Sequence, residues 1–199
     1  PAESELAGSF GVSRSTVREA LRSLTSRNLL ETTRGTTGGT FVRKIQVGQV
    51  REYLEMSLGL MWGADEITVT EMLEAREVLE VPAARLAAER RHHVDQMVEA
   101  IDRETRSRGR GVKFREHRTF HGVIVQAAGN GLLELMTDPV FHVLQTRFLD
   151  PEVPPSFWAV VDDDHRTITE AIREHDADAA ADALRDHLVR LREVYRDPR

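Results

Sequence analysis

The stretch that decides the fold is "ELAGSFGVSRSTVREALRSL", residues 5–24. Its apolar residues follow helical spacing on both sides of one glycine, which predicts two short helices joined by a tight turn. A helix-turn-helix needs a small residue where the helices meet, a glycine at the turn and a branched apolar residue in the second helix. Ala7, Gly11 and Val17 supply these, and Ser13 offers an N-cap hydroxyl to the second helix.

The segment after the second helix no longer shows helical spacing. Leu29–Thr33 and Thr40–Arg43 favour two short strands around a glycine-rich tip at 34–39, which predicts a β-hairpin. The two helices and this hairpin make a winged helix-turn-helix of residues 1–45. Residues 46–66 form a linker, in which we expect one helix.

The remaining residues, 67–199, are predicted to be an all-helical antiparallel bundle, so the fold class is mainly α. A glycine-rich helix stop lies at 129–131, and Asp176 is placed to cap the last helix. Helical spacing predicts helices near 70–90, 94–106, 112–128, 131–148, 156–174 and 177–195.

Composition restricts the function and the location of the protein. The chain has 199 residues, 40% of them hydrophobic, and no cysteine, so histidine and carboxylates are its strong metal ligands. No apolar run approaches the ~20 residues that span a bilayer, and no signal peptide is apparent, so we expect a cytoplasmic protein without a membrane partner. The chain begins at Pro1 within a helical pattern, which suggests a fragment whose first domain is truncated at its start.

The charge is divided unevenly along the chain. Residues 1–45 carry seven basic and four acidic side chains, a balance of +3, and the whole chain stands at −6, which leaves −9 for the remainder. This uneven distribution suggests that the basic residues 1–45 bind a polyanion and that the acidic remainder of the chain does not. The exposed start of the second helix would enter the DNA major groove with Ser13, Arg14, Ser15, Thr16 and Arg18. The alternative is a solvated two-helix corner.

Four histidines are predicted to face the interior of the bundle. His117 and His121 stand four residues apart on one helical face, and His165 and His187 lie on the apolar sides of two later helices. Each buried neutral imidazole carries a donor and an acceptor that need partners. Spacing alone leaves two alternatives open: separately hydrogen-bonded core residues, or four ligands of one divalent cation.

The stretch "AESELAGSFGVSRSTVREALRSLTSRNLLETTRGTTGGTFV" resembles the winged helix-turn-helix of GntR-type bacterial transcription regulators. The resemblance implies that the family's first helix would precede Pro1. It also implies that Ser4 replaces a DNA-contacting arginine of the family pattern. The implied DNA contacts come from Ser13, Arg14, Ser15, Thr16 and Arg18, and from Arg34, Gly35 and Thr36 at the wing tip.

The segments "EMLEAREVLEVPAARLAAER", "FREHRTFHGVIVQAAGN" and "DHRTITEAIREHDADAAADALRDHL" resemble the ligand-sensing FCD domain of the FadR branch of that family. In many members an Asp-x-x-x-His pair and two later histidines bind a metal, which implies His117, His121, His165 and His187 as ligands here. His117 stands where an aspartate is usual, and imidazole in place of carboxylate favours Zn²⁺ or Ni²⁺. Glu116 is rotated away from this face.

The resemblance also implies an effector. Arg76 matches an arginine that faces the family's ligand cavity, and Arg147 is a second candidate from its helical position. We therefore expect a transcription repressor rather than an enzyme: a homodimer on a palindromic operator, whose DNA binding changes when a small carboxylate reaches the metal. The alternatives are a metal-dependent hydrolase-type enzyme and an acyl-CoA-responsive regulator without metal. Whether His117 ligates the metal or turns away, leaving three histidines, stays open.

Overall fold

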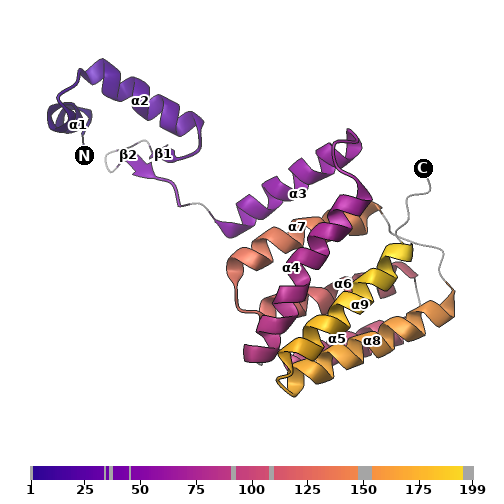
Figure 1. Ribbon diagram of the computed structural model, residues 1–199. Helices are drawn as coiled ribbons and strands as arrows, with labels where there is room; N and C mark the ends of the chain where they lie inside the picture. The colour runs from indigo at the N-terminus through magenta and orange to yellow at the C-terminus, as the bar shows by residue number, and fades with distance from the viewer. Residues whose placement is uncertain are drawn as a thin grey trace. The chain divides into compact units, whose positions relative to one another are not determined.

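The protein divides into two compact units, Pro1–Gln46 and Val47–Arg199 (Figure 1). The computed structural model describes residues 2–33, 35, 38–44, 46–90, 93–107, 110–147 and 154–194, apart from the side chains of 110–112, 145, 147, 155, 193 and 194.

The first unit is a helix-turn-helix followed by a hairpin, as the sequence predicted. Its elements are α1 (Glu3–Phe10), α2 (Arg14–Ser26), β1 (Leu30–Thr33) and β2 (Gly39–Val42). The two strands are antiparallel, with Leu30 opposite Val42 and Thr33 opposite Gly39.

Local chemistry explains the turn between α1 and α2. Gly11 ends α1 with a φ of 66°, in the left-handed region that glycine adopts without strain. Ser13 then caps α2, because its Oγ accepts a hydrogen bond of 3.1 Å from the backbone N–H of Thr16. Ala7 and Val17 are buried, where the two helices pack together.

The second unit is helical throughout the part that the structure describes. Its helices in the described ranges are α3 (Val47–Gly63), α4 (Val69–Arg90), α5 (Val94–Arg106), α6 (Arg110–Ala127), α7 (Gly131–Arg147), α8 (Pro155–Arg173) and α9 (Ala177–Val194). Helix α4 packs against α6, α7, α8 and α9, whereas α3 packs along α7 (Figure 1). No helix in the described ranges has the length and apolar character needed to cross a membrane.

Side-chain caps define several helix starts in the second unit. Thr68 and Glu71 form a reciprocal capping box, with the Thr68 N–H donating to Glu71 Oε2 at 2.8 Å and the Glu71 N–H donating to Thr68 Oγ1 at 3.2 Å. Asn130 accepts from the backbone N–H of Leu132 at the start of α7. Asp176 caps α9, as the sequence predicted, by accepting from the N–H of Ala179 at 2.9 Å.

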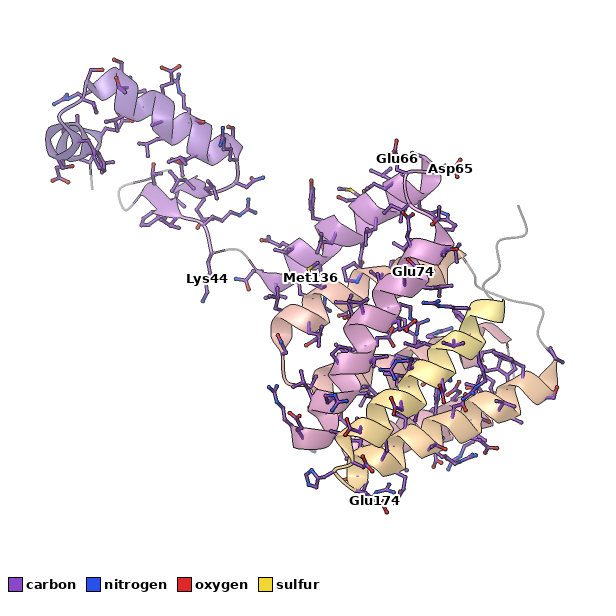
Figure 2. All side chains as sticks on the ribbon, viewed as in Figure 1. Lys44, Asp65, Glu66, Glu74, Met136 and Glu174 are labelled. Carbon is purple, nitrogen blue, oxygen red and sulfur yellow. The ribbon has the colours of Figure 1, made fainter. Side chains whose placement is uncertain are left out.

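The core of the second unit combines apolar residues with a buried polar group. Ala84, Ala87 and Ala88 are fully buried on α4, where small side chains let neighbouring helices approach closely. Among these apolar side chains lies a set of buried titratable residues: Arg76, Glu80, Glu104, His117, His121, His165 and His187. Figure 2 shows how densely side chains fill the space between these helices.

Candidate metal centre

The four predicted histidines come together in the interior of the bundle. His117 and His121 project from α6, His165 from α8 and His187 from α9, and each has a relative exposure of 2% or less. One nitrogen from each ring lies within 4.8 Å of the others. The helical spacing seen in the sequence therefore places all four imidazoles at one point.

The neighbours of the histidines explain why they face inward. His121 follows the buried Phe120, and α6 continues into the core with Ile124. His165 lies one turn before the buried Ile168, and His187 lies between Leu184 and Leu191 on the apolar side of α9. Burial of these apolar residues fixes the rotation of each helix and carries the imidazoles inward with them.

Every one of the four Nδ1 atoms faces a carboxylate. Nδ1 of His121 lies 2.7 Å from Glu80, and Nδ1 of His187 lies 3.0 Å from Asp164. Glu104 reaches two rings, with its carboxylate oxygens 2.8 Å from Nδ1 of His165 and 3.4 Å from Nδ1 of His117. A carboxylate at Nδ1 holds the proton there and leaves Nε2 as the free ligand atom, which is the usual arrangement around metal-bound histidines.

The buried ring nitrogens fit a cation better than they fit one another. The Nε2 atoms of His121 and His187 face each other at 3.2 Å. If Glu80 and Asp164 hold the protons on Nδ1, both Nε2 atoms are acceptors and no proton lies between them. The Nε2 atoms of His117 and His165 have no hydrogen-bond partner among the described residues. Such buried polar atoms are costly unless an ion or water satisfies them.

Burial keeps the imidazoles of His117, His121 and His187 neutral, as metal ligands must be. Burial lowers the pKa of His117 to about 4, although Glu104 beside it acts in the opposite direction. Burial likewise holds the pKa of His121 and of His187 well below the ordinary value for histidine. At neutral pH these rings therefore offer lone pairs rather than charges.

The carboxylates differ in their electrostatic surroundings. Burial raises the pKa of Glu80, and Arg76 partly offsets this rise. Burial would also raise the pKa of Glu104, but the contacts with His117 and His165 outweigh it and hold the pKa below its ordinary value. Glu104 is therefore an ionised carboxylate in the interior of the bundle.

The two predicted effector residues have different outcomes. Arg76 is 2% exposed, its Nε donates to Glu80 Oε1 at 2.7 Å, and its guanidinium lies 4.6 Å from the ring centroid of Phe141. It thus joins the histidine cluster through Glu80, which contacts His121. The side chain of Arg147 lies outside the described residues.

Sequence reasoning missed Glu80, Glu104 and Asp164. A signal existed for Glu104, because it follows the buried Met97, Ala100 and Ile101 at helical spacing on α5. A signal also existed for Glu80, which stands four residues after Arg76 on the buried face of α4. Glu116 was predicted to point away from the cluster, and it does, since it pairs with Arg103 instead.

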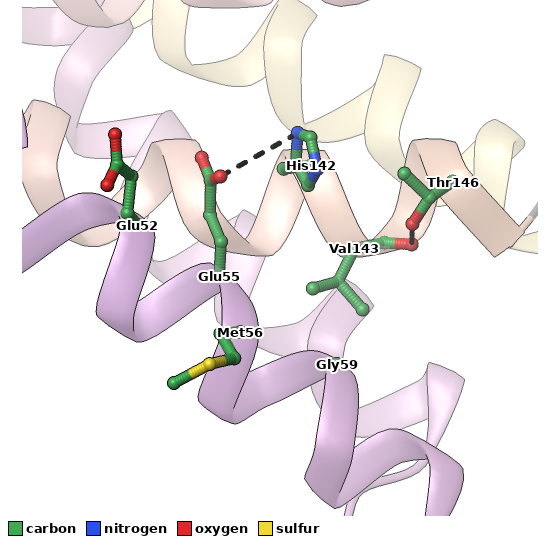
Figure 3. A pocket seen from close by; sticks show the side chains of 7 residues that line it. All are labelled: Glu52, Glu55, Met56, Gly59, His142, Val143 and Thr146. Carbon is green, nitrogen blue, oxygen red and sulfur yellow. Dashed lines mark hydrogen bonds and ion pairs between the residues drawn. The ribbon is translucent and has the colours of Figure 1, made fainter.

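Two of the other histidines lie apart from this cluster. His142 lines a groove of about 530 Å³ between α3 and α7, where its Nδ1 is 4.0 Å from Glu55 (Figure 3). The Nδ1 atom of His175 lies 2.6 Å from the backbone oxygen of Ala88. His92 lies outside the described residues.

The predicted DNA-contacting side chains lie at the exposed start of α2. The hydroxyl of Ser13 is hydrogen-bonded to those of Ser15 and Thr16, at 2.7 and 2.8 Å, and Arg14 is exposed beside them. Arg18 is also exposed, and it pairs with Glu3 of α1 at 2.9 Å.

At the wing tip, Gly35 adopts a φ of 124°, a conformation that favours glycine. The neighbouring predicted contacts, Arg34 and Thr36, lie outside the described residues.

Both parts of the chain match family models. Residues 71–190 match the family described as "FCD domain", and residues 1–42 match "Bacterial regulatory proteins, gntR family".

Similar proteins match along almost the whole chain. The putative L-lactate dehydrogenase operon regulatory protein of Escherichia coli (strain K12) is 31% identical, over 94% of this chain and 74% of that protein. The HTH-type transcriptional regulator LutR of Bacillus subtilis (strain 168) is 30% identical, over 95% and 87%. The galactonate operon transcriptional repressor of Escherichia coli is 28% identical, over 92% and 81%. Among solved structures, Streptococcus agalactiae GntR aligns with a TM-score of 0.56 at 26% identity, over 97% of this chain and 88% of that one.

Proposed function

The chain belongs to the GntR family of bacterial transcription regulators and carries an FCD domain, and on this premise we propose that it is a metal-dependent repressor that responds to a small carboxylate. Family membership confirms the prediction of a DNA-binding transcription regulator and removes the alternative of a hydrolase-type enzyme. The assignment to the FadR branch is part of the proposal, as is a location in the cytoplasm.

The proposed metal ligands are the Nε2 atoms of His117, His121, His165 and His187. This proposal rests on four buried rings, each with one nitrogen within 4.8 Å of a nitrogen of the others, and on the carboxylate that faces every Nδ1. A set of neutral imidazoles suits Zn²⁺ or Ni²⁺ better than the hard ions Mg²⁺ and Mn²⁺. A bound ion of this kind would supply a Lewis acid to which a carboxylate oxygen can coordinate.

The proposed effector is a small carboxylate. Two of the relatives are named for the operons of L-lactate dehydrogenase and of galactonate. Lactate and galactonate, the compounds in these names, are both hydroxy acids. Arg76 is the proposed cation for the effector's other oxygens, since a guanidinium binds carboxylates in a fork. Its present partner is Glu80, so an incoming carboxylate would compete with Glu80 for the guanidinium. Arg147 stays a second candidate.

The proposed DNA-binding unit is residues 1–45, joined by a linker at 46–66 to the effector and dimerisation domain at 67–199. GntR regulators bind operator DNA and typically act as dimers, and two copies would place two winged helices on a palindrome. The proposed contacts are Ser13, Arg14, Ser15, Thr16, Arg18, Arg34, Gly35 and Thr36. A coupling of ~1–3 kcal/mol between effector and operator would change the affinity about 5- to 150-fold.

The single observation that carries this proposal is the buried four-histidine cluster. The test is metal analysis of protein purified without chelators or a histidine tag, followed by titration of the protein–operator complex with candidate carboxylates. We expect one Zn²⁺ or Ni²⁺ per chain, and release of DNA by a small carboxylate from the wild type but not from His187→Ala. His142→Ala is the control, because this exposed histidine lies outside the cluster.

Two results would contradict the proposal. Absence of stoichiometric metal, with ligand binding unchanged in His117→Ala, would favour the acyl-CoA-responsive alternative. Equal loss of the response in His142→Ala and His187→Ala would separate the response from the histidine cluster.

A further inference from the structure

Glu104 is a fully buried carboxylate in the cluster. Its relative exposure is 0%, and it lies on the inner face of α5 beside Met97, Ala100 and Ile101. Helix α5 packs against α6 and α8, the helices that carry His117 and His165. A charged side chain at such a position is rare unless it is paired or near a metal ion.

Glu104 differs from the other two carboxylates in the number of imidazoles it reaches. Among the imidazoles that the structure describes, Glu80 contacts only that of His121, and Asp164 contacts only that of His187. Glu104 contacts two rings from two helices, at 2.8 Å to His165 and 3.4 Å to His117. The Glu104 side chain therefore contacts two of the four proposed metal ligands.

Glu104 also differs in how its charge is compensated. The charge of Glu80 is paired with Arg76 at 2.7 Å, and that of Asp164 with Arg190 at 2.6 Å. Within the described residues, Glu104 makes no ion pair with an arginine or a lysine, and its two oxygens face the Nδ1 atoms of His165 and His117 instead. The imidazole N–H groups donate toward this carboxylate but do not neutralise it, so a cation bound to those rings would balance its charge.

We infer that Glu104 is a positioning residue that makes His117 and His165 metal ligands. This inference rests on the proposed metal site. Its carboxylate accepts from both Nδ1 atoms, which leaves both Nε2 lone pairs for the shared ion, and it supplies a negative charge beside an ion whose proposed ligands are imidazoles alone. A glutamine at this position accepts a hydrogen bond from one ring through its oxygen, but its NH₂ group only donates and cannot accept one from the Nδ1–H of the second ring.

The test compares Glu104→Gln with the wild type and with Glu99→Gln, a matched change at an exposed position of the same helix. Zinc affinity is measured by competition with a chromophoric chelator. We expect Glu104→Gln to bind Zn²⁺ about 10- to 100-fold more weakly than the wild type, and Glu99→Gln to bind as the wild type does. Asp164→Asn should lose less affinity than Glu104→Gln, because Arg190 already compensates the charge of Asp164.

A second readout separates positioning from a merely structural role. Long-range ¹H–¹⁵N correlation spectra of the zinc-loaded wild type should show His117 and His165 protonated at Nδ1 and bound through Nε2. This measurement needs no variant, so it decides the inference even if Glu104→Gln does not fold.

The inference is overturned if Glu104→Gln binds zinc within about twofold of the wild type, since outer-shell partners typically matter about 10- to 100-fold. It is also overturned if either ring in the wild type binds through Nδ1. A wild type that takes up no zinc overturns the proposed function as well, whereas a wild type that binds zinc independently of Glu104 overturns the inference alone.

Discussion

His121 and His187, from helices α6 and α9, point their Nε2 atoms at each other across 3.2 Å in the interior of the second unit. Their Nδ1 atoms face the carboxylates of Glu80 and Asp164 at 2.7 and 3.0 Å. The carboxylates therefore orient the two rings through Nδ1, and the Nε2 atoms converge on one place. This is the geometry of a pair of metal ligands rather than of two independent core residues.

The first prediction concerns metal addition. A ligand present at 100 times its dissociation constant stabilises the folded state by about 2.7 kcal/mol. Each kcal/mol shifts the melting temperature of a domain of this size by about 2–4 °C. Zn²⁺ added to metal-free protein should thus raise the melting temperature of the second unit by about 5–11 °C in differential scanning calorimetry.

The controls for this prediction are two histidine variants. His187→Ala should lose most of the zinc-induced shift in melting temperature. His142→Ala should keep it, because the partly exposed His142 faces Glu55 and lies outside the histidine cluster. A full shift in His187→Ala would place the zinc elsewhere.

The second prediction concerns pH. Burial lowers the pKa of His117 from its ordinary value of 6.5 to about 4 in the folded state. Between these values the unfolded chain binds the extra proton, so acid favours unfolding. The free energy of unfolding therefore has its full value above about pH 6.5, and it decreases as the pH falls toward about 4.

The size of this effect follows from linkage. One such histidine costs about 1.4 kcal/mol per pH unit, and His121 and His187 are shifted in the same direction. Glu80, whose pKa burial raises, acts in the opposite sense. Urea unfolding of the metal-free protein between pH 5 and 7.5 should show the loss, and His117→Gln should reduce it. A flat profile would contradict the neutral, buried state of these rings.

The third prediction concerns the buried ion pair. Arg76 and Glu80 are 2% and 1% exposed, and their N–O distance is 2.7 Å. Arg76→Met leaves Glu80 buried without its cation, so it should lower the free energy of unfolding by about 3–5 kcal/mol. Adding Glu80→Gln should restore part of this loss.

A surface pair provides the comparison. Arg173 pairs with Glu170 while 48% exposed, so Arg173→Met should cost less than about 1 kcal/mol. If Arg76→Met cost no more than Arg173→Met in urea titrations, the buried pair would not contribute to the stability of the core.

The fourth prediction concerns DNA. Arg14 is exposed at the start of α2, where a guanidinium can contact a base edge worth about 1–3 kcal/mol. Arg14→Ala should weaken operator binding about 5- to 150-fold, measured by fluorescence anisotropy at fixed salt with DNA selected by the wild type. Arg166→Ala, an exposed arginine on α8, should leave the affinity unchanged. Equal affinities for the wild type and Arg14→Ala would remove Arg14 from the interface.

Local patterns were sufficient for the secondary structure. Gly11 ends α1 and Ser13 begins α2 because their preferences act within a few residues. Asp176 caps α9 for the same reason. The inward direction of His117 and His121 also followed from the sequence, because residues four apart on a helix share a face, and that face carries Phe114 and Ile124.

Contacts between helices did not follow from the sequence. Glu104 and His165 are 2.8 Å apart in space but lie on different helices, and no local rule relates two helices whose packing is unknown. The same is true of Glu3 and Arg18, an exposed pair that ties α1 to the predicted DNA-contacting face.

By itself the sequence determined the helices, their caps, the hairpin and the inward faces that carry the histidines, because periodicity and capping are local properties of the chain. Only the tertiary structure decided which carboxylates contact the Nδ1 atoms of those histidines. The packing of α5 on α6 and α8 brings Glu104 to two rings at once, and the packing of α8 on α9 brings Asp164 to His187. Whether His117 lies with the other three rings was likewise settled by packing, and it does, with its ring centroid 4.6 Å from that of His121.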